Sequence, residues 1–238
     1  MDGTIDGNLS NVMSKVERAA RKAGRAPSEV TVVCVTKNVD TKHIKEAIRA
    51  GMRVFGENYI QEAKEKIEKL RKNNLVWHFI GNLQKNKAKY AALLFDVIET
   101  VDSLELAKEL SKRAKKPMDV LIQVNIAKEK TKAGVDVKHL DKLVHAVAKL
   151  ENLRLRGLMT IPPYYENPEL SRPYFVTLRR VAERINKENI PGVSMRDLSM
   201  GMSNDFEVAI EEGATIVRIG RMVFGERPEK PGKRPPGR

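Results

Sequence analysis

The sequence predicts one α/β domain folded as a (β/α)8 barrel, the TIM-barrel class. Short runs rich in β-branched residues alternate with longer amphipathic stretches, which is typical of parallel β/α units. About eight such units follow one another, the number that closes a barrel. The 238 residues, 41% of them hydrophobic, are enough for one sizeable core. A doubly wound open sheet is the alternative, but neither a Gly-x-Gly-x-x-Gly nor a GxxxxGK[ST] motif supports it.

The elements are expected in the following order. An extra helix at about residues 9–23 precedes the barrel. Eight apolar runs, each flanked by polar or turn-forming residues, are expected to be strands: residues 30–36, 52–56, 75–81, 95–101, 119–127, 153–159, 194–200 and 214–220. Between them, Asp40 and Asp102 are expected to cap helices, and Ser203 or Asn204 to open a helix that Gly213 ends. The long loop at residues 160–170 contains prolines that prevent a helix start.

The net charge of +13 raises the question of a nucleic-acid partner. Part of the excess lies in the Pro-, Gly-, Lys- and Arg-rich end of the chain, so we predict a barrel domain at residues 1–227 and a disordered basic tail at residues 228–238. The remaining cations are spread over helix faces that also carry glutamate, and aromatic residues make up only 5%. We therefore expect no specific nucleic-acid partner.

Other compositional features exclude further classes. The single cysteine, Cys34, allows no intrachain disulfide, and the four histidines show no metal-ligand spacing. The first ten residues are polar and acidic, unlike a signal peptide, and no apolar run is long enough to span a bilayer. We expect a cytoplasmic protein with no metal and no membrane partner.

Lys37 follows the first expected strand, at the edge where barrels build their sites. Side chains alternate along a strand, so Val33, Val35 and Lys37 share one face and Cys34 takes the other. If the valines fill the barrel, Lys37 points into its mouth and Cys34 packs under the helices. A lysine there is a candidate Schiff-base former, and a salt-bridged or snorkelling lysine is the plainer alternative.

The loops after the seventh and eighth strands predict a phosphate site. Ser199, Met200 and Gly201 follow one strand, and Gly220 and Arg221 follow the other. Barrels bind phosphate at these loops, where glycine lets backbone N–H groups approach an anion. An ordinary turn explains either glycine alone, but the two together favour an anion site.

Arg218 shares a strand face with Ile216 and Gly220, so a charged side chain points into the barrel. A buried arginine needs a partner, which is either an internal carboxylate such as Glu57 or an acceptor atom on a ligand. An aldehyde-capturing lysine, a phosphate cradle and an arginine facing a heteroatom together describe pyridoxal 5′-phosphate (PLP).

Seven segments between Val30 and Arg227 carry a resemblance to a known family: VTVVCVTK, VFGENYIQEAKEK, WHFIGNLQKNKAKY, IQVNIAKEKTKAGV, LRGLMTIPP, LSMGMSNDFEVAIEEGATIVRIG and VFGER. In order and spacing they resemble the pyridoxal phosphate homeostasis protein family. That family is similar to the barrel domain of fold-type III enzymes such as alanine racemase. The resemblance implies an alanine racemase N-terminal-domain-like fold and a role in holding, protecting or passing on PLP.

The resemblance also implies site residues. Lys37 corresponds to the lysine that forms the internal aldimine with PLP, and Arg218 to the arginine that faces the pyridine nitrogen. Ser199, Gly201 and Gly220 correspond to the phosphate cradle.

Three further positions complete the comparison with the family. Asn58 is implied to lie beside the cofactor, and Lys132 matches a second lysine near the mouth of the site. The chain departs from the pattern at Arg221, where many relatives have Ser or Thr. Its guanidinium either replaces a hydroxyl contact with a charge-assisted one or points to solvent.

We expect a PLP carrier and not an enzyme. An arginine at the ring nitrogen disfavours protonation of the ring and so weakens its electron sink. Racemases with this feature need a second base, which comes from a separate C-terminal domain, and we expect no such domain here. Tyr164 and Tyr165 are the candidates within the barrel, but loop packing or a lid explains them better. We expect a monomer that passes PLP to PLP-dependent apoenzymes.

Three alternatives stay open. A single-domain PLP-dependent racemase would turn over amino acids. A class I aldolase would use Lys37 to trap a carbonyl substrate and would lack a bound chromophore. A polyanion-binding protein would show steeply salt-dependent binding that survives mutation of Lys37.

Overall fold

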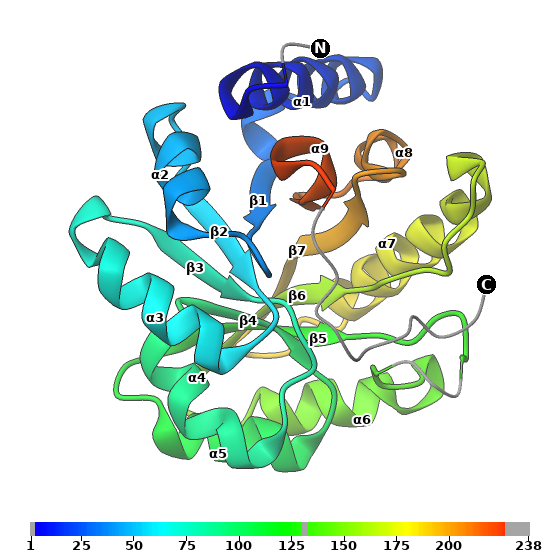
Figure 1. The fold of residues 1–238 in the computed structure, drawn as a ribbon. Coiled ribbons are helices and arrows are strands. Elements are labelled where there is room, and N and C mark those ends of the chain that lie inside the picture. The colour runs from blue at the N-terminus through cyan, green and yellow to red at the C-terminus, as the bar shows by residue number, and fades with distance from the viewer. Residues whose placement is uncertain (1–2, 130–132, 227–238) are drawn as a thin grey trace.

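The computed structural model describes residues 3–129 and 133–226, and these form a closed barrel of eight parallel strands surrounded by helices (Figure 1). The strands pair in sequence order, and β8 pairs with β1 to close the barrel. The predicted (β/α)8 barrel is confirmed, and the open sheet is excluded. The predicted tail at residues 228–238 and Lys132 lie outside the described residues, so the domain limits stay a prediction.

All eight predicted strands are present; β6 has the predicted ends, and the ends of the other strands lie within four residues of those expected. They are β1 (Thr31–Val35), β2 (Val54–Glu57), β3 (Val76–Phe79), β4 (Val97–Val101), β5 (Met118–Gln123), β6 (Leu153–Met159), β7 (Val193–Met202) and β8 (Ile216–Ile219). The α-helices of the described residues are α1 (Ile5–Lys22), α2 (Thr41–Arg49), α3 (Ile60–Leu70), α4 (Ala88–Leu94), α5 (Leu104–Arg113), α6 (Val137–Val147), α7 (Arg172–Lys187), α8 (Phe206–Glu211) and α9 (Arg221–Phe224).

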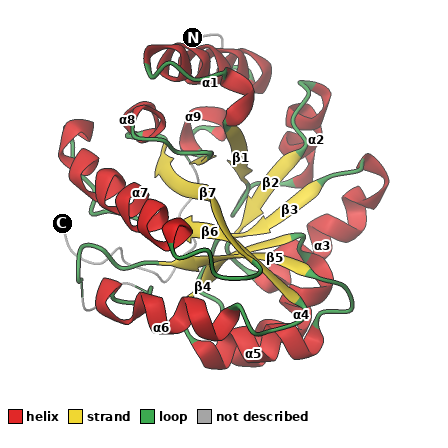
Figure 2. Cartoon of the chain, turned by 180° about the vertical axis from the view of Figure 1, so that it is seen from behind, coloured by secondary structure: helices red, strands yellow, loops and turns green. Residues whose placement is uncertain are grey.

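The predicted N-terminal helix is α1, which lies outside the barrel beside α8 and α9 (Figures 1 and 2). Its buried side chains recur every three to four residues, as on an amphipathic helix: Ile5, Leu9, Val12, Val16, Ala19 and Ala20. The last helix, α9, has only four residues. Helix α1 therefore packs on the outside of α8 and α9 and extends the helical layer there. Among the described residues, no helix has the length and apolar character that crossing a membrane requires.

Two apolar layers follow from the alternation of side chains along the strands. Val33, Leu121, Met159 and Ile216 pack together inside the barrel. Cys34 belongs to the other layer, between the strands and the helices, as predicted. It is fully buried, and burial raises the pKa of its thiol to about 12, so the thiolate is not available as a nucleophile.

Two helix starts differ from the predicted ones. Ser103, and not Asp102, caps α5 with its side-chain oxygen. Asp205, and not either residue before it, precedes α8. Its carboxylate accepts a hydrogen bond of 2.7 Å from the backbone N–H of Met202, so it closes the loop after β7 instead of capping its own helix.

Candidate functional site

A pocket of about 530 Å³ opens at the carboxyl ends of the strands. Five of the predicted site residues line it: Lys37, Asn58, Arg218, Gly220 and Arg221. They come from segments that follow β1 and β2, from β8 itself, and from the turn between β8 and α9. The strand order of the barrel therefore brings together residues that are up to 184 positions apart, as Lys37 and Arg221 are.

Ser199, Met200 and Gly201, predicted at the phosphate loop, do not line this pocket. Met200 is buried in the layer under the helices. Gly201 has a φ of +93°, and a Cβ there would lie 2.9 Å from the backbone of Phe206, so this glycine is required for packing against α8. The structure thus gives the glycine a role in the fold of the loop.

The next residues of the same loop line the pocket instead. Ser203 and Asn204 stand just before α8 and both border the cavity. Sequence reasoning missed them as pocket residues because it chose Ser199, which lies earlier in the chain. Their place directly before a helix start was the signal, since hydroxyl and amide groups there lie next to free backbone N–H groups.

Arg218 reaches the pocket from inside the barrel, where its side chain is only 3% exposed. Its Nη1 donates to Oγ of Ser199 at 2.5 Å, and its Nη2 donates to the carbonyl oxygen of Thr160 at 2.9 Å. The hydroxyl of Ser199 in turn donates to Glu99 Oε2 at 2.6 Å. Ser199 is therefore a support for the arginine.

The carboxylate nearest to Arg218 is Glu99, at 4.0 Å, and not Glu57 as one interpretation of the sequence had it. His78 Nδ1 lies 2.5 Å from Glu99 Oε1. Burial raises the pKa of Glu99, but the hydrogen bond with His78 and the charges of His78 and Arg218 outweigh it and hold that pKa below its usual value. We call His78, Glu99, Ser199 and Arg218 the barrel network.

Sequence reasoning missed Glu99 and His78. Each stands in a strand made mostly of apolar residues, on the face that points into the barrel, as Arg218 does. A second charged residue on an inward strand face was the available signal, because a buried arginine needs an opposite charge.

Lys37 is half-buried and borders the pocket together with Val35, as the alternation along β1 predicts. The residue after it, Asn38, has a φ of +56°, which is unusual for a residue with a side chain. The chain therefore turns sharply at the lysine, directly after the strand ends.

Asn58 is held against the next strand by a close backbone contact. A Cβ on Gly81 would lie 2.2 Å from the carbonyl oxygen of Asn58, so only glycine fits there. The side-chain Oδ1 of Asn58 is buried and has no partner among the described residues. Asn58 lines the same pocket as Lys37, so this buried oxygen is an acceptor that a ligand group can satisfy.

The loop after β6 forms another side of the pocket through Tyr164 and Tyr165. Tyr164 is 68% exposed. The hydroxyl of Tyr165 lies 2.9 Å from that of Tyr174 on α7, and the two rings stack. The amide of Asn204 donates to the carbonyl oxygen of Tyr165 at 2.8 Å. The loop is thus fastened both to α7 and to the loop after β7.

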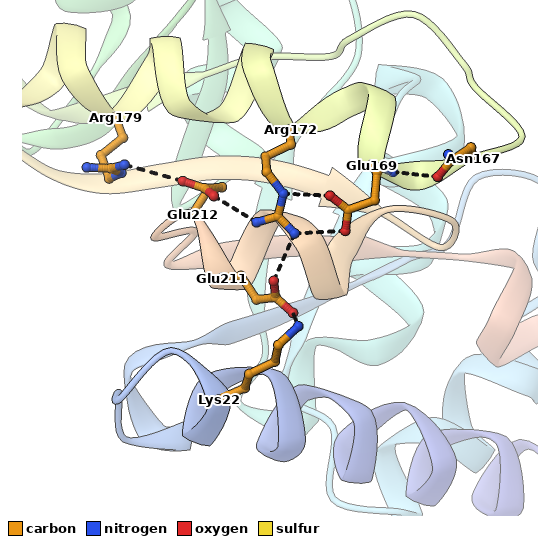
Figure 3. A network of polar contacts seen from close by, with 7 residues as sticks. All are labelled: Lys22, Asn167, Glu169, Arg172, Arg179, Glu211 and Glu212. Carbon is orange, nitrogen blue, oxygen red and sulfur yellow. Dashed lines mark hydrogen bonds and ion pairs between the residues drawn. The ribbon is translucent and has the colours of Figure 1, made fainter.

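The end of the same loop is tied down by Arg172, the first residue of α7 (Figure 3). Its guanidinium binds Glu169 in the loop and both Glu211 and Glu212 at the end of α8. Lys22 of α1 contacts Glu211 at 2.6 Å. We call Lys22, Arg172, Glu211 and Glu212 the surface network; it joins α1, α7 and α8 outside the barrel.

Comparison with known proteins identifies the family. The family model for the N-terminal domain of alanine racemase matches residues 8–228. A protein of Aquifex aeolicus (strain VF5) named pyridoxal phosphate homeostasis protein is 46% identical over 222 residues, which cover 92% of this chain and 96% of the relative. The chain belongs to the pyridoxal phosphate homeostasis protein family.

Solved structures place the family among related barrels. PipY of Synechococcus elongatus PCC7942, solved with PLP bound, is 35% identical with a TM-score of 0.78, covering 89% of this chain and 100% of PipY. Alanine racemase of Corynebacterium glutamicum has a TM-score of 0.67 at 15% identity. That match covers 92% of this chain and 62% of the racemase. The likeness to the racemase is one of fold alone.

Proposed function

We propose that this protein binds PLP in the pocket at the carboxyl ends of the strands, with Lys37 bound covalently to it, and that it acts as a PLP carrier without appreciable amino-acid turnover. The observation that carries the proposal is that one pocket of about 530 Å³ is lined by a lysine, a fixed arginine and the two loops after β7 and β8. The 46% identical relative is named for PLP homeostasis, and PipY was solved with PLP bound.

The lining residues fit the chemical groups of PLP. The amine of Lys37 can condense with the aldehyde, forming a C=N bond and releasing one water. Arg218 presents N–H donors, and the neutral pyridine nitrogen of PLP is an acceptor for them. Ser203, Gly220 and Arg221 lie at the two loops where barrels bind phosphate. When bound, PLP supplies an electrophilic carbon and an aromatic ring to the site.

The predicted absence of amino-acid turnover is supported by the tyrosines beside the pocket. The hydroxyl of Tyr165 is hydrogen-bonded to Tyr174, which raises the pKa of Tyr174. Tyr164 is largely exposed to water. A general base must lie within hydrogen-bond reach of the proton that it removes, whereas the hydroxyl of Tyr165 is engaged with Tyr174 and Tyr164 extends into solvent. The cytoplasmic location, the monomeric state and delivery to PLP-dependent apoenzymes stay predictions.

The test is the visible absorption of the purified protein after addition of PLP, compared with a Lys37→Ala variant. We expect a band in the wild type that borohydride reduces and that is absent from the variant. Mapping of the reduced protein should find the label on Lys37. A Lys42→Ala variant, altered at an exposed lysine of α2, is the matched control and should retain the band. The absence of a band in the wild type would contradict the proposed binding of PLP to Lys37.

Two further assays separate the proposed carrier from its alternatives. Racemisation and decarboxylation of amino acids by the loaded protein should stay at the rate of free PLP. Arg221→Ser should weaken binding of PLP more than binding of pyridoxal, which lacks the phosphate, if Arg221 contacts that group. Equal losses for both compounds would place Arg221 outside the phosphate site.

A further inference from the structure

A buried lysine lies behind the strand that presents Lys37. Lys66 of α3 is 5% exposed and points from the helix toward the end of β1. Its Nζ donates to the carbonyl oxygen of Thr36 at 2.6 Å, to Glu57 Oε1 at 2.7 Å and to Glu62 Oε1 at 2.7 Å. All three donors of the ammonium group are thus used within one buried cluster.

The same cluster holds the chain on both sides of Lys37. Thr36 is contacted at its carbonyl oxygen by Lys66, and its hydroxyl donates to Glu57 Oε1 at 2.6 Å. On the other side, Glu62 Oε1 accepts a hydrogen bond of 2.6 Å from the backbone N–H of Asn38. Lys37 therefore sits between two residues that are each fixed by side chains of α3 or of the end of β2.

The backbone at this point needs such support. Asn38 has a φ of +56°, a conformation that residues with a side chain adopt rarely and that persists where the surroundings hold it. The hydrogen bond from its N–H to Glu62 supplies a contact that depends on this turn. Release of Glu62 would let the turn relax and would change the direction in which Lys37 leaves the strand.

The chemistry of the cluster points to a purpose beyond packing. Buried ionic groups are costly to desolvate, and apolar side chains would fill the space between a helix and a sheet at less cost. Burial raises the pKa of Glu57 even though Lys66 is in contact with it. What an apolar cluster could not provide is the directional hydrogen bonding to Thr36 and Asn38.

We propose that Glu62 and Lys66, together with Glu57, are positioning residues that fix the turn on either side of Lys37 and so hold its amine in place for capture of an aldehyde. This inference rests on the proposed function of Lys37. Bond formation requires the two reacting atoms to meet in a narrow range of positions, so a displacement of about 1 Å can slow a reaction about 100-fold.

The experiment measures the rate constant with which the visible band appears after PLP is added to the wild type, Glu62→Ala, Glu62→Gln and Lys66→Met. We expect Glu62→Ala and Lys66→Met to be slower by about 10-fold or more. Glu62→Gln keeps an oxygen that can accept from Asn38 N–H and should stay within about 3-fold of the wild type. Glu65→Ala and Lys69→Met, which alter exposed residues of the same helix, are matched controls and should react at the wild-type rate.

Circular dichroism in the visible band and the melting temperature without PLP distinguish positioning from general loss of structure. A positioning role predicts a weaker dichroic band in Glu62→Ala at a melting temperature close to that of Glu62→Gln. If Glu62→Ala forms the band at the wild-type rate, the positioning role is overturned. The proposed function still stands in that case, because the wild type shows the band. If Lys66→Met does not fold, the pair of Glu62 variants decides alone. No band in the wild type would overturn the proposed function and this inference together.

Discussion

The barrel network and the surface network both join arginine to glutamate, yet they differ in burial. In the barrel network, the side chains of His78, Glu99 and Arg218 are 6% exposed or less, and Ser199 is fully buried. In the surface network, exposure ranges from 15% at Glu212 to 67% at Lys22. The same kinds of charged groups thus meet in two environments that differ strongly in their access to water.

Exposure to water decides what each network contributes. Water screens the surface charges and can replace a lost partner, so that network fastens helices with redundant contacts. Inside the barrel the groups are largely shielded from water, so a lost partner is costly and each contact helps to fix where Arg218 stands. A binding site gains from buried contacts such as those of the barrel network, because its hydrogen-bond donors must stay in one geometry. Substitutions in the two networks should therefore differ in their effect on stability and on PLP binding.

Removal of the buried carboxylate should be the most damaging change. Glu99→Ala leaves Arg218 buried without its counter-charge, so we expect the free energy of unfolding to fall by about 3–5 kcal/mol. Urea denaturation without PLP measures it. Glu65→Ala, on the exposed face of α3, should change stability by less than about 0.5 kcal/mol. A loss below about 1 kcal/mol in Glu99→Ala would mean that burial does not determine how much this network contributes to the free energy of unfolding.

Loss of the bridging hydroxyl should have an intermediate effect. Ser199→Ala removes the acceptor of Arg218 Nη1 and one donor to Glu99, so we expect a loss of about 1–3 kcal/mol. PLP binding, followed by fluorescence titration, should weaken as well, because Arg218 lines the pocket. Ser103→Ala, which alters a helix cap far from Arg218 in sequence, should reduce stability but leave the PLP dissociation constant unchanged. Unchanged PLP binding in Ser199→Ala would contradict a supporting role for the hydroxyl.

The surface network should tolerate more. Arg172→Ala breaks contacts to Glu169, Glu211 and Glu212, but the arginine is 28% exposed and its partners remain hydrated. We expect a loss of about 1 kcal/mol that shrinks when salt is added. Thermal denaturation at low and high ionic strength measures both effects. A loss as large as that of Glu99→Ala, or one independent of salt, would remove the distinction between the two networks.

The smallest expected effect is a pH dependence of the barrel network. The pKa of Glu99 is below its usual value in the folded protein, so the folded state favours the charged form. The stability that this carboxylate contributes is present above the usual pKa of about 4.5 and is lost as pH falls through the lower folded pKa. The difference in unfolding free energy between wild type and Glu99→Gln should therefore shrink in that acidic range. A difference that stays constant there would contradict the predicted sign.

Local sequence patterns were sufficient to predict the architecture and the place of Lys37. Alternating apolar runs and helix caps are properties of neighbouring residues, so they predicted eight strands and the inward face shared by Val33, Val35 and Lys37. The face opposite to it was equally predictable, which is why Cys34 was expected under the helices. The inward direction of Arg218 followed from the same rule. The direction of a side chain depends on its own strand alone, so it can be predicted from the sequence.

Which side chains contact one another depends on how the strands and helices pack in the closed barrel. Glu99 and Ser199 are 100 positions apart and come together because barrel closure and strand register bring β4, β7 and β8 to one interior. The choice of Glu99 over Glu57 as the carboxylate near Arg218 depends on that register, which no local pattern encodes. Likewise Lys66 finds Thr36 only because α3 packs over the end of β1. Local periodicity fixes the direction of a side chain, whereas its partner is fixed by long-range packing of the closed barrel.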